Sequence, residues 1–240
     1  MNAITRIYVD ESRYNLYTMP HKALRRAQMQ ISIRLGAIDG EDEEALGALV
    51  ADMRGLIAAG RGHLHHENLH IHEVIEQLRA GATEQLADDH EHHERDFDEL
   101  EAMLDAIEAA PAGERASLLR ALYLRYSLFI AADLQHMVEE ETETLALLHS
   151  LFGDDELRAI ENRIIASIDA ETMMGFLRLM VPAMNHGERL ELIGCMRAGM
   201  PAAIFEGVLN GVVRPSLGEA EFRRLGGDLG FAGHGHRAAG

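Results

Sequence analysis

Apolar residues recur at intervals of three and four positions along most of this chain, which is the spacing of one face of an α-helix. Glycines, prolines and cap-forming residues divide the pattern into long stretches at about residues 19–36, 43–79, 84–109 and 114–150. Thr18 and Asp42 stand where they can cap the first two stretches. Four long helices with short connections predict an all-α fold, an up-down-up-down four-helix bundle.

The remaining residues predict a C-terminal appendage of short helices. Its apolar stretches, from "DDELRAIENRIIASI" to "GEAEFRRLGGDLG", each begin with a cap-like residue or a proline. His186 and Glu188, in the helix start "NHGE", are expected to serve as capping residues. We therefore expect the bundle over residues 1–152, a helical extension packed on it over 153–232, and a flexible tail over 233–240.

The composition narrows the class of protein. One cysteine among 240 residues excludes a disulfide framework and favours a reducing cytoplasm. The N-terminus lacks an apolar core of signal-peptide length, and no apolar run is long enough to span a membrane, so no membrane partner is expected. The formal net charge of −18 argues against nucleic acid as a partner, because phosphates would be repelled, and it suits a protein that binds cations.

The chain has fourteen histidines, and many of them fall in the clusters "HLHHENLHIHE" and "DDHEHHE". Helical spacing separates the inward side chains from the outward ones. His65 and His72 fall on the outward face of the second long helix and are expected at the surface. The inward stripe of that helix comprises Leu49, Met53, Leu56, Gly60, His63, Glu67, His70, Ile71, Val74 and Leu78.

The other long helices also place histidine among their inward residues, so each of the four aims at least one imidazole at the interior. The second and fourth helices add a glutamate four positions after a histidine. The inward residues are Tyr17, His21, Leu24, Gln28, Ile31 and Leu35 on the first helix, Leu86, His90, His93, Phe97, Leu100 and Leu104 on the third, and Leu122, Tyr126, Phe129, Asp133, His136, Glu140, Thr144 and Leu147 on the fourth.

These polar residues favour a bound cation. A lone inward histidine is usually a satisfied core residue, and a His–Glu pair four positions apart is often a surface pair worth a few tenths of a kcal/mol. A buried charge without a partner, however, costs several kcal/mol. Four histidines and two glutamates that converge in one interior are satisfied by a dinuclear metal site, with imidazoles as terminal ligands and carboxylates as bridges.

The order of these residues resembles the hemerythrin-like family of HHE cation-binding domains. The matching pieces are "PHKALR", "HLHHE", "DHEHHERDFDELEAML" and "HMVEEET", and they cover about residues 15–152. The segment "MVPAMNHGERLELIGCMRAGMP" is similar to the C-terminal extension of some bacterial members. The resemblance implies a centre of two iron ions, for which zinc or manganese can substitute, with the ligands His21, His63, Glu67, His90, His136 and Glu140.

Within this resemblance Glu67 and Glu140 are the bridging carboxylates. The third helix offers two inward histidines, and His90 is preferred to His93 because the apolar residues after it then fall at the family's usual offsets. Asp133 is interpreted as an acceptor that holds an imidazole N–H beside the site.

The resemblance also implies dioxygen, nitric oxide or peroxide as small ligands, and therefore sensing, iron handling or peroxide removal. Oxygen carriers of the family have a second histidine four residues after the third-helix ligand, where this chain has Glu94. We therefore expect a reduced centre that oxidises in air, with a reversible oxygen carrier as the alternative. Enzymatic activity, as a di-iron oxidase or in peroxide removal, and homodimerisation stay open at this point.

Two other kinds of site compete with this interpretation. A ferritin-like carboxylate di-iron oxidase needs an ExxH motif on two helices and a glutamate on each of the other two. Glu67–His70 and Asp133–His136 come close to the first requirement, but the first helix has no inward glutamate. A structural or interaction protein would bind zinc only at exposed histidines, here His65, His72, His92, His234 and His236.

Overall fold

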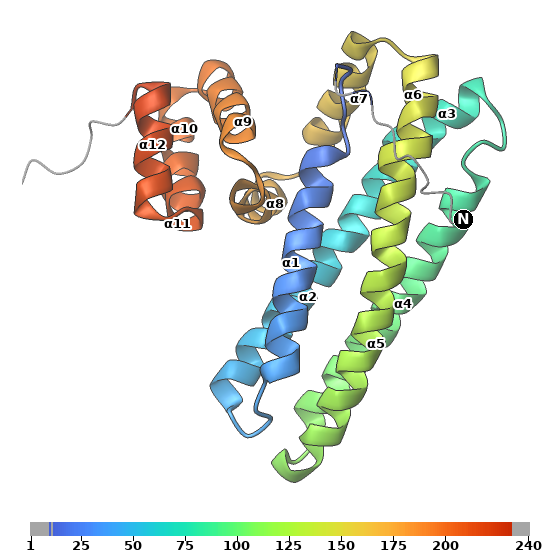
Figure 1. Ribbon diagram of the computed structural model, residues 1–240, viewed down its shortest axis with the longest axis vertical. Coiled ribbons are helices and arrows are strands. Elements are labelled where there is room, and N and C mark those ends of the chain that lie inside the picture. The colour runs from blue at the N-terminus through green and yellow to red at the C-terminus, as the bar shows by residue number, and fades with distance from the viewer. Residues whose placement is uncertain (1–9, 11, 232–240) are drawn as a thin grey trace, which may run out of the picture. The chain divides into compact units, whose positions relative to one another are not determined.

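The structure is a computed structural model that describes residue 10 and residues 12–231. Within these residues the expected all-α class is confirmed, because helix follows helix and no strand occurs (Figure 1). The elements are α1 (Thr18–Ala37), α2 (Glu43–Glu67), η1 (Asn68–His72), α3 (Glu73–Leu78), α4 (Glu84–Ala109), α5 (Ala112–Glu139), η2 (Glu140–Thr144), α6 (Leu145–Leu151), α7 (Asp154–Ser167), α8 (Ala170–Ala183), α9 (His186–Gly199), α10 (Ala202–Val208), η3 (Leu209–Val213), α11 (Arg214–Ser216) and α12 (Glu219–Leu229), where η denotes a π-helical turn.

The chain divides into two compact units between Ser167 and Ile168. This boundary lies one helix later than the expected one at residue 152. The reason is that α7 belongs to the first unit, where Leu157 and Ile160 are buried in one apolar cluster with Leu16 and other residues. The tail expected over residues 233–240 lies outside the described part of the chain.

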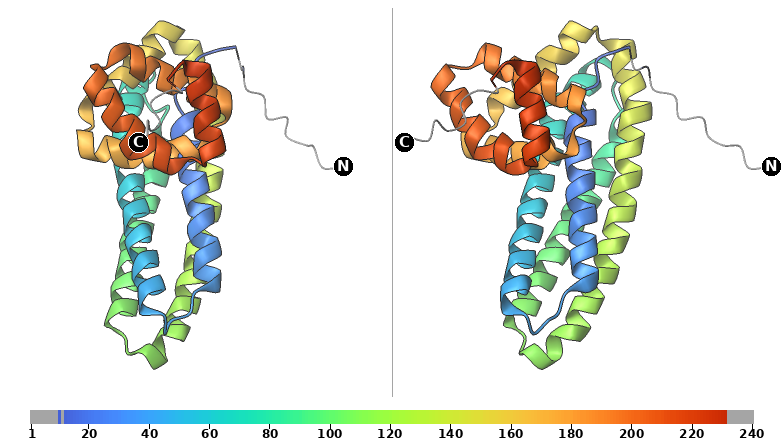
Figure 2. Two further views of the ribbon diagram at one scale, coloured as in Figure 1. Left: turned by 90° about the vertical axis from the view of Figure 1, so that its left-hand side faces the viewer. Right: turned by 60° about the vertical axis from the view of Figure 1, so that its left-hand side comes forward.

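In the first unit the long helices α1, α2, α4 and α5 lie side by side (Figure 1, Figure 2). Helix α1 packs against α2 and α5, and α4 packs against the same two helices from the other side. All residues predicted to face inward on α1 and α4 are buried, the first set beginning at Tyr17 and ending at Leu35, the second beginning at Leu86 and ending at Leu104. Among the described residues, no helix combines the length and hydropathy that crossing a bilayer requires.

The helix starts agree only in part with the predicted caps. Asp42 caps α2 as predicted, since its carboxylate accepts a hydrogen bond from the backbone N–H of Ala45 at 3.0 Å. Thr18 does not cap α1, because it already lies in the first turn. Asn15 takes this role instead, and its Oδ1 accepts from the N–H groups of Tyr17 at 2.9 Å and Thr18 at 3.2 Å.

The π turn η1 changes which face of the second long helix is buried. A π turn contains one residue more than an α-helical turn, so the side chains after it are rotated by about 100°. The inward positions are therefore Ile71 and Ile75, whereas Leu78 is 60% exposed. The expectation that His72 faces outward was wrong for the same reason, because its side chain is buried.

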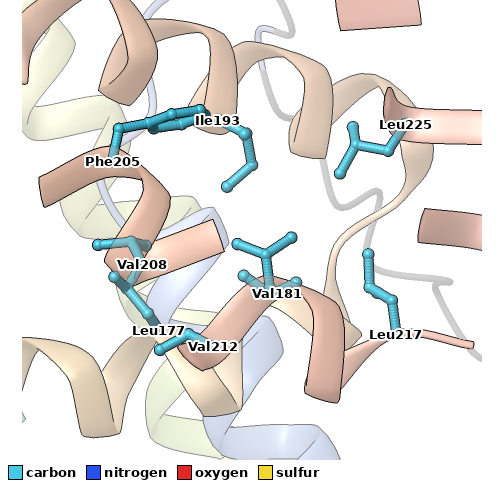
Figure 3. Packing of buried hydrophobic residues seen from close by; sticks show 9 residues of the cluster. Leu177, Val181, Ile193, Phe205, Val208, Val212, Leu217 and Leu225 are labelled. Atoms are coloured by element: carbon cyan, nitrogen blue, oxygen red, sulfur yellow. The ribbon is translucent and has the colours of Figure 1, made fainter. Parts of the chain in front are cut away.

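The second unit has an apolar interior built by α8 to α12 (Figure 3). The predicted capping role of Glu188 is confirmed, since Asn185 and Glu188 form a reciprocal capping box at the start of α9. His186 does not cap this helix and instead pairs with Asp228 at 2.8 Å. The buried residues of this interior are Leu177, Val181, Ile193, Phe205, Val208, Val212, Val213, Leu217 and Leu225.

Candidate metal centre

The six candidate ligands come from all four long helices of the first unit and meet in its interior. All of them are buried except His63, whose side chain is 11% exposed. The side chains meet here because each helix carries polar residues at inward positions of an otherwise apolar stripe. The contributing positions are His21 in the first turn of α1, His63 and Glu67 in the last turns of α2, His90 in α4, His136 near the end of α5, and Glu140 at the start of η2.

The first half of the centre joins two histidines to both glutamates. One ligand atom from each of His21, His63, Glu67 and Glu140 lies within 4.8 Å of the other three. The Nε2 atom of His21 is 3.3 Å from Oε2 of Glu140 and 3.6 Å from Oε1 of Glu67. The Nε2 atom of His63 is 3.1 Å from the same Oε1 of Glu67. These atoms enclose one position at which a cation would contact nitrogen and oxygen.

The second half uses the same glutamates with two other histidines. Glu67, His90, His136 and Glu140 again bring one ligand atom each within 4.8 Å of the others. The Nε2 atoms of His90 and His136 are 3.0 Å apart, and they lie 3.8 Å and 3.5 Å from Oε1 of Glu140. Because both halves share Glu67 and Glu140, the geometry is that of two neighbouring cation positions with two carboxylates between them.

Most of the atoms that face these positions lack hydrogen bonds; the exception is the contact between Nε2 of His90 and Nε2 of His136. Nε2 of His21, Nε2 of His63 and all four carboxylate oxygens of Glu67 and Glu140 are buried and without a partner. Buried polar atoms are nearly always hydrogen-bonded, and leaving them unpaired costs free energy. Neutral imidazoles and carboxylates are the donor set that suits zinc, manganese and iron. The residues therefore fit a bound metal and do not fit a hydrogen-bonded core.

The outer nitrogens of two imidazoles are held by neighbouring polar side chains. Nδ1 of His21 is 2.9 Å from the carboxylate of Glu141, which also binds Arg25. Nδ1 of His90 is 2.8 Å from the amide oxygen of Asn68. Such contacts fix the ring orientation and leave the other nitrogen free to coordinate a metal. Sequence reasoning missed Glu141 and Asn68, although each directly follows a predicted bridging glutamate.

The two glutamates have opposite pKa shifts. Burial, reinforced by the charge of Glu140, raises the pKa of Glu67 to about 7. Burial also acts on Glu140, but the adjacent His21 and His90 outweigh it and hold the pKa of Glu140 well below its usual range. Two carboxylates this close cannot both ionise cheaply without a cation between them. Burial lowers the pKa of His63 well below its usual value, which keeps this imidazole in the neutral form that binds metals.

Each of the two glutamates shared by the metal groups stands at a π turn. Glu67 is the last residue before η1, and Glu140 is the first residue of η2. The rotation at η1 brings His72 inward, where its ring stacks on that of His90 with centroids 4.9 Å apart. The periodic pattern did not predict either turn, and π turns are frequent at functional sites.

His93 and Asp133 lie beside the centre rather than in it. Neither belongs to the groups that could hold a metal among the described residues. The Nε2 atom of His93 is 3.4 Å from Oδ1 of Asp133, and the other carboxylate oxygen of Asp133 accepts from the amide of Gln28. Asp133 thus faces an imidazole, as predicted, but this imidazole belongs to His93 and not to His136.

The remaining candidate residues point away from the centre. Glu94 is partly exposed and forms an ion pair with Arg61. His65 and His92 are exposed, as predicted, and His70 is partly buried but lies outside both metal groups. The other two histidines expected at the surface, His234 and His236, lie outside the described part of the chain. In comparisons with known proteins, no family model, curated protein or solved structure matches this chain.

Proposed function

We propose that the protein is a non-haem di-iron protein whose first unit is a hemerythrin-like four-helix bundle. The observation that carries the proposal is a pair of adjacent groups of buried ligand atoms that share Glu67 and Glu140. The lack of hydrogen bonds at these atoms supports it, because two divalent cations would satisfy all of them at once. The order of the ligands along the chain, which resembles the hemerythrin-like family, supports iron as the metal.

We further propose that the centre senses or reacts with its small ligand and is not a reversible oxygen carrier. Glu94 stands where carriers have a second histidine, and its pairing with Arg61 keeps it out of the site. Each ion would then be held by two imidazoles and by the two shared carboxylates. This set leaves open positions for dioxygen, nitric oxide or peroxide, as in catalytic metal sites generally. Sensing, iron handling and peroxide removal all use such positions.

The ferritin-like alternative has less support. It requires His70 and Asp133 as ligands, but both lie outside the two metal groups of the described residues. It also requires an inward glutamate on the first helix, and α1 contributes His21 at this level. A site rich in imidazole therefore agrees better with the geometry than one rich in carboxylate.

Anaerobic purification with metal quantification, and a visible spectrum before and after exposure to air, tests the proposal. We expect about two iron ions per chain, as in dinuclear bundle sites, and lasting oxidation in air. His63→Ala should lower the bound iron sharply, whereas His65→Ala, two residues away on the exposed face, should leave it unchanged. Equal loss in the two variants would contradict the site, and repeated cycles of oxygen release would show a carrier.

A further inference from the structure

A cavity of about 20 Å³ lies in the interior of the first unit, next to the candidate metal centre. This volume holds one water-sized molecule or slightly more. Most of its walls are apolar, with the rings of Phe97 and Phe129 among them, but Gln28, His63 and Asp133 also line it. His63 connects the cavity to the centre, because its Nε2 atom is 3.1 Å from Oε1 of Glu67.

The amide of Gln28 has a defined orientation, and its oxygen is free. Nε2 of Gln28 donates a hydrogen bond to Oδ2 of Asp133, so the contact between the two side chains uses the NH₂ group of the amide. The side-chain oxygen of Gln28 is consequently the unused end. It is buried and has no hydrogen-bond partner, and the residue as a whole is 3% exposed. Buried acceptors in native proteins are seldom left without a hydrogen bond unless a bound molecule supplies the donor.

The polar groups of the cavity therefore form an acceptor-rich wall. The Gln28 oxygen and the Asp133 carboxylate are both hydrogen-bond acceptors, and both residues line the cavity. A molecule that donates hydrogen bonds is stabilised here, whereas one without hydrogen atoms gains nothing from either oxygen. The amide is thus suited to select among the small ligands of the neighbouring metal centre.

We propose that this cavity is a ligand subsite of the metal centre and that it selects small molecules that carry a hydroxyl group. Water occupies the subsite in the resting protein, and hydrogen peroxide or a similar hydrogen-bond donor with two heavy atoms replaces this water. Dioxygen and nitric oxide carry no hydrogen and are not favoured by it. The inference rests on the proposed function and narrows it, because it favours peroxide chemistry over the sensing of diatomic gases. Gln28 is a positioning residue in this scheme and not a metal ligand.

Two probes bound to the cobalt(II)-loaded protein test the subsite. Hydroxylamine donates hydrogen bonds, whereas azide is an anion without a hydrogen atom, and the visible spectrum of cobalt(II) reports the affinity for each. Gln28→Met keeps the length of the side chain but removes the acceptor. We expect the affinity for hydroxylamine to fall about tenfold, the effect of losing one hydrogen bond, and the affinity for azide to stay within about twofold.

Two further variants exclude a purely structural effect. Gln30→Met alters a glutamine on the exposed side of α1 and should change neither affinity. Asp133→Asn keeps the shape of the side chain and gives it an NH₂ group that can donate to the Gln28 oxygen, so the acceptor is satisfied internally and hydroxylamine should again bind about tenfold more weakly.

The outcomes separate the subsite from the metal centre. Equal weakening of hydroxylamine and azide in Gln28→Met, or unchanged binding of hydroxylamine in both Gln28→Met and Asp133→Asn, would overturn the subsite while the bound cobalt still supports the centre. A wild-type protein that binds no cobalt would overturn the proposed function, and the subsite with it.

Discussion

The interiors of the two units differ in how their buried polar groups are satisfied. In the first unit, buried atoms of His21, Glu67 and Glu140 have no hydrogen-bond partner. In the described part of the second unit no buried side-chain nitrogen or oxygen is left unpaired. Its one buried charged residue, Arg189, donates from Nε to the carbonyl of Val181 at 2.8 Å and pairs with Glu221 at 2.9 Å.

The comparison is informative because both units contain π turns. The turn η3 in the second unit places Val212 and Val213 in the apolar cluster. The turns η1 and η2 in the first unit place His72 and Glu140 in the interior. A π turn by itself therefore does not mark a site. The marker is the combination of an inward polar side chain with the absence of a protein partner for it.

The largest expected effect follows from removal of one of the two carboxylates shared by the metal groups. A metal present at a thousand times its dissociation constant stabilises the folded state by about 4 kcal/mol. Glu140→Ala should abolish most of this gain in stability. Calorimetry with and without iron measures the gain, and metal quantification measures the bound iron. Glu143→Ala removes an exposed glutamate from the same π turn and should retain the gain. If the two variants lose metal equally, the unpaired atoms of the first unit have another explanation.

The pH dependence of the metal-free protein should show the cost of burying Glu67. Its pKa rises from 4.5 to about 7, so between these values the folded protein keeps a proton that the unfolded chain has released. The free energy of unfolding should therefore fall as the pH rises through this window, by on the order of 2 kcal/mol. Glu67→Gln, which cannot ionise, should flatten the profile. Urea denaturation at pH 5 and pH 8 measures the difference, and identical profiles would contradict it.

Arg189, the buried arginine of the second unit, tests the opposite case, in which a buried polar group has its hydrogen bonds within the protein. Arg189→Met removes the donors that contact the carbonyls of Val181 and Pro182 and leaves these acceptors unpaired. We expect a loss of about 2 kcal/mol in the free energy of unfolding. The metal content should stay at the wild-type level, because no metal group among the described residues includes Arg189. A parallel loss of metal would show that the two interiors depend on each other.

Two glycines of α2, Gly60 and Gly55, allow a test of the packing beside the centre, and the second gives the smallest expected effect. A Cβ atom added at Gly60 would lie 2.6 Å from Cζ of Phe97, so Gly60→Ala should destabilise the protein by about 1–3 kcal/mol through overpacking. Gly55 lies on the same helix with nothing within 4 Å of an added Cβ. Gly55→Ala should instead stabilise by about 0.5–1 kcal/mol, since alanine favours helix. Thermal unfolding of the pair measures this contrast, and equal shifts would argue against the close approach of Phe97.

The sequence predicted the helices and the convergence of six candidate ligands because both depend on the α-helical period. It failed where that period changes. The predicted orientations of His72 and Leu78 were both wrong, since one extra residue in η1 rotates the side chains that follow it. The partner of Asp133 was also not predictable, because the contact with His93 joins two helices and depends on how they pack. Spacing within a single helix contains no information about such a contact.

The turn η1 also affects how chain lengths should be compared. A chain that builds the same interior with an uninterrupted α-helix would be one residue shorter between Glu67 and Ile75. An alignment of the two would then contain a single-residue gap inside a helix, where insertions and deletions are normally penalised most. Deleting Asn68 should remove the turn and leave His72 and Ile75 on the buried face, because the lost residue and the lost rotation cancel. A length difference that usually indicates a loop would in this helix indicate the edge of the candidate metal centre.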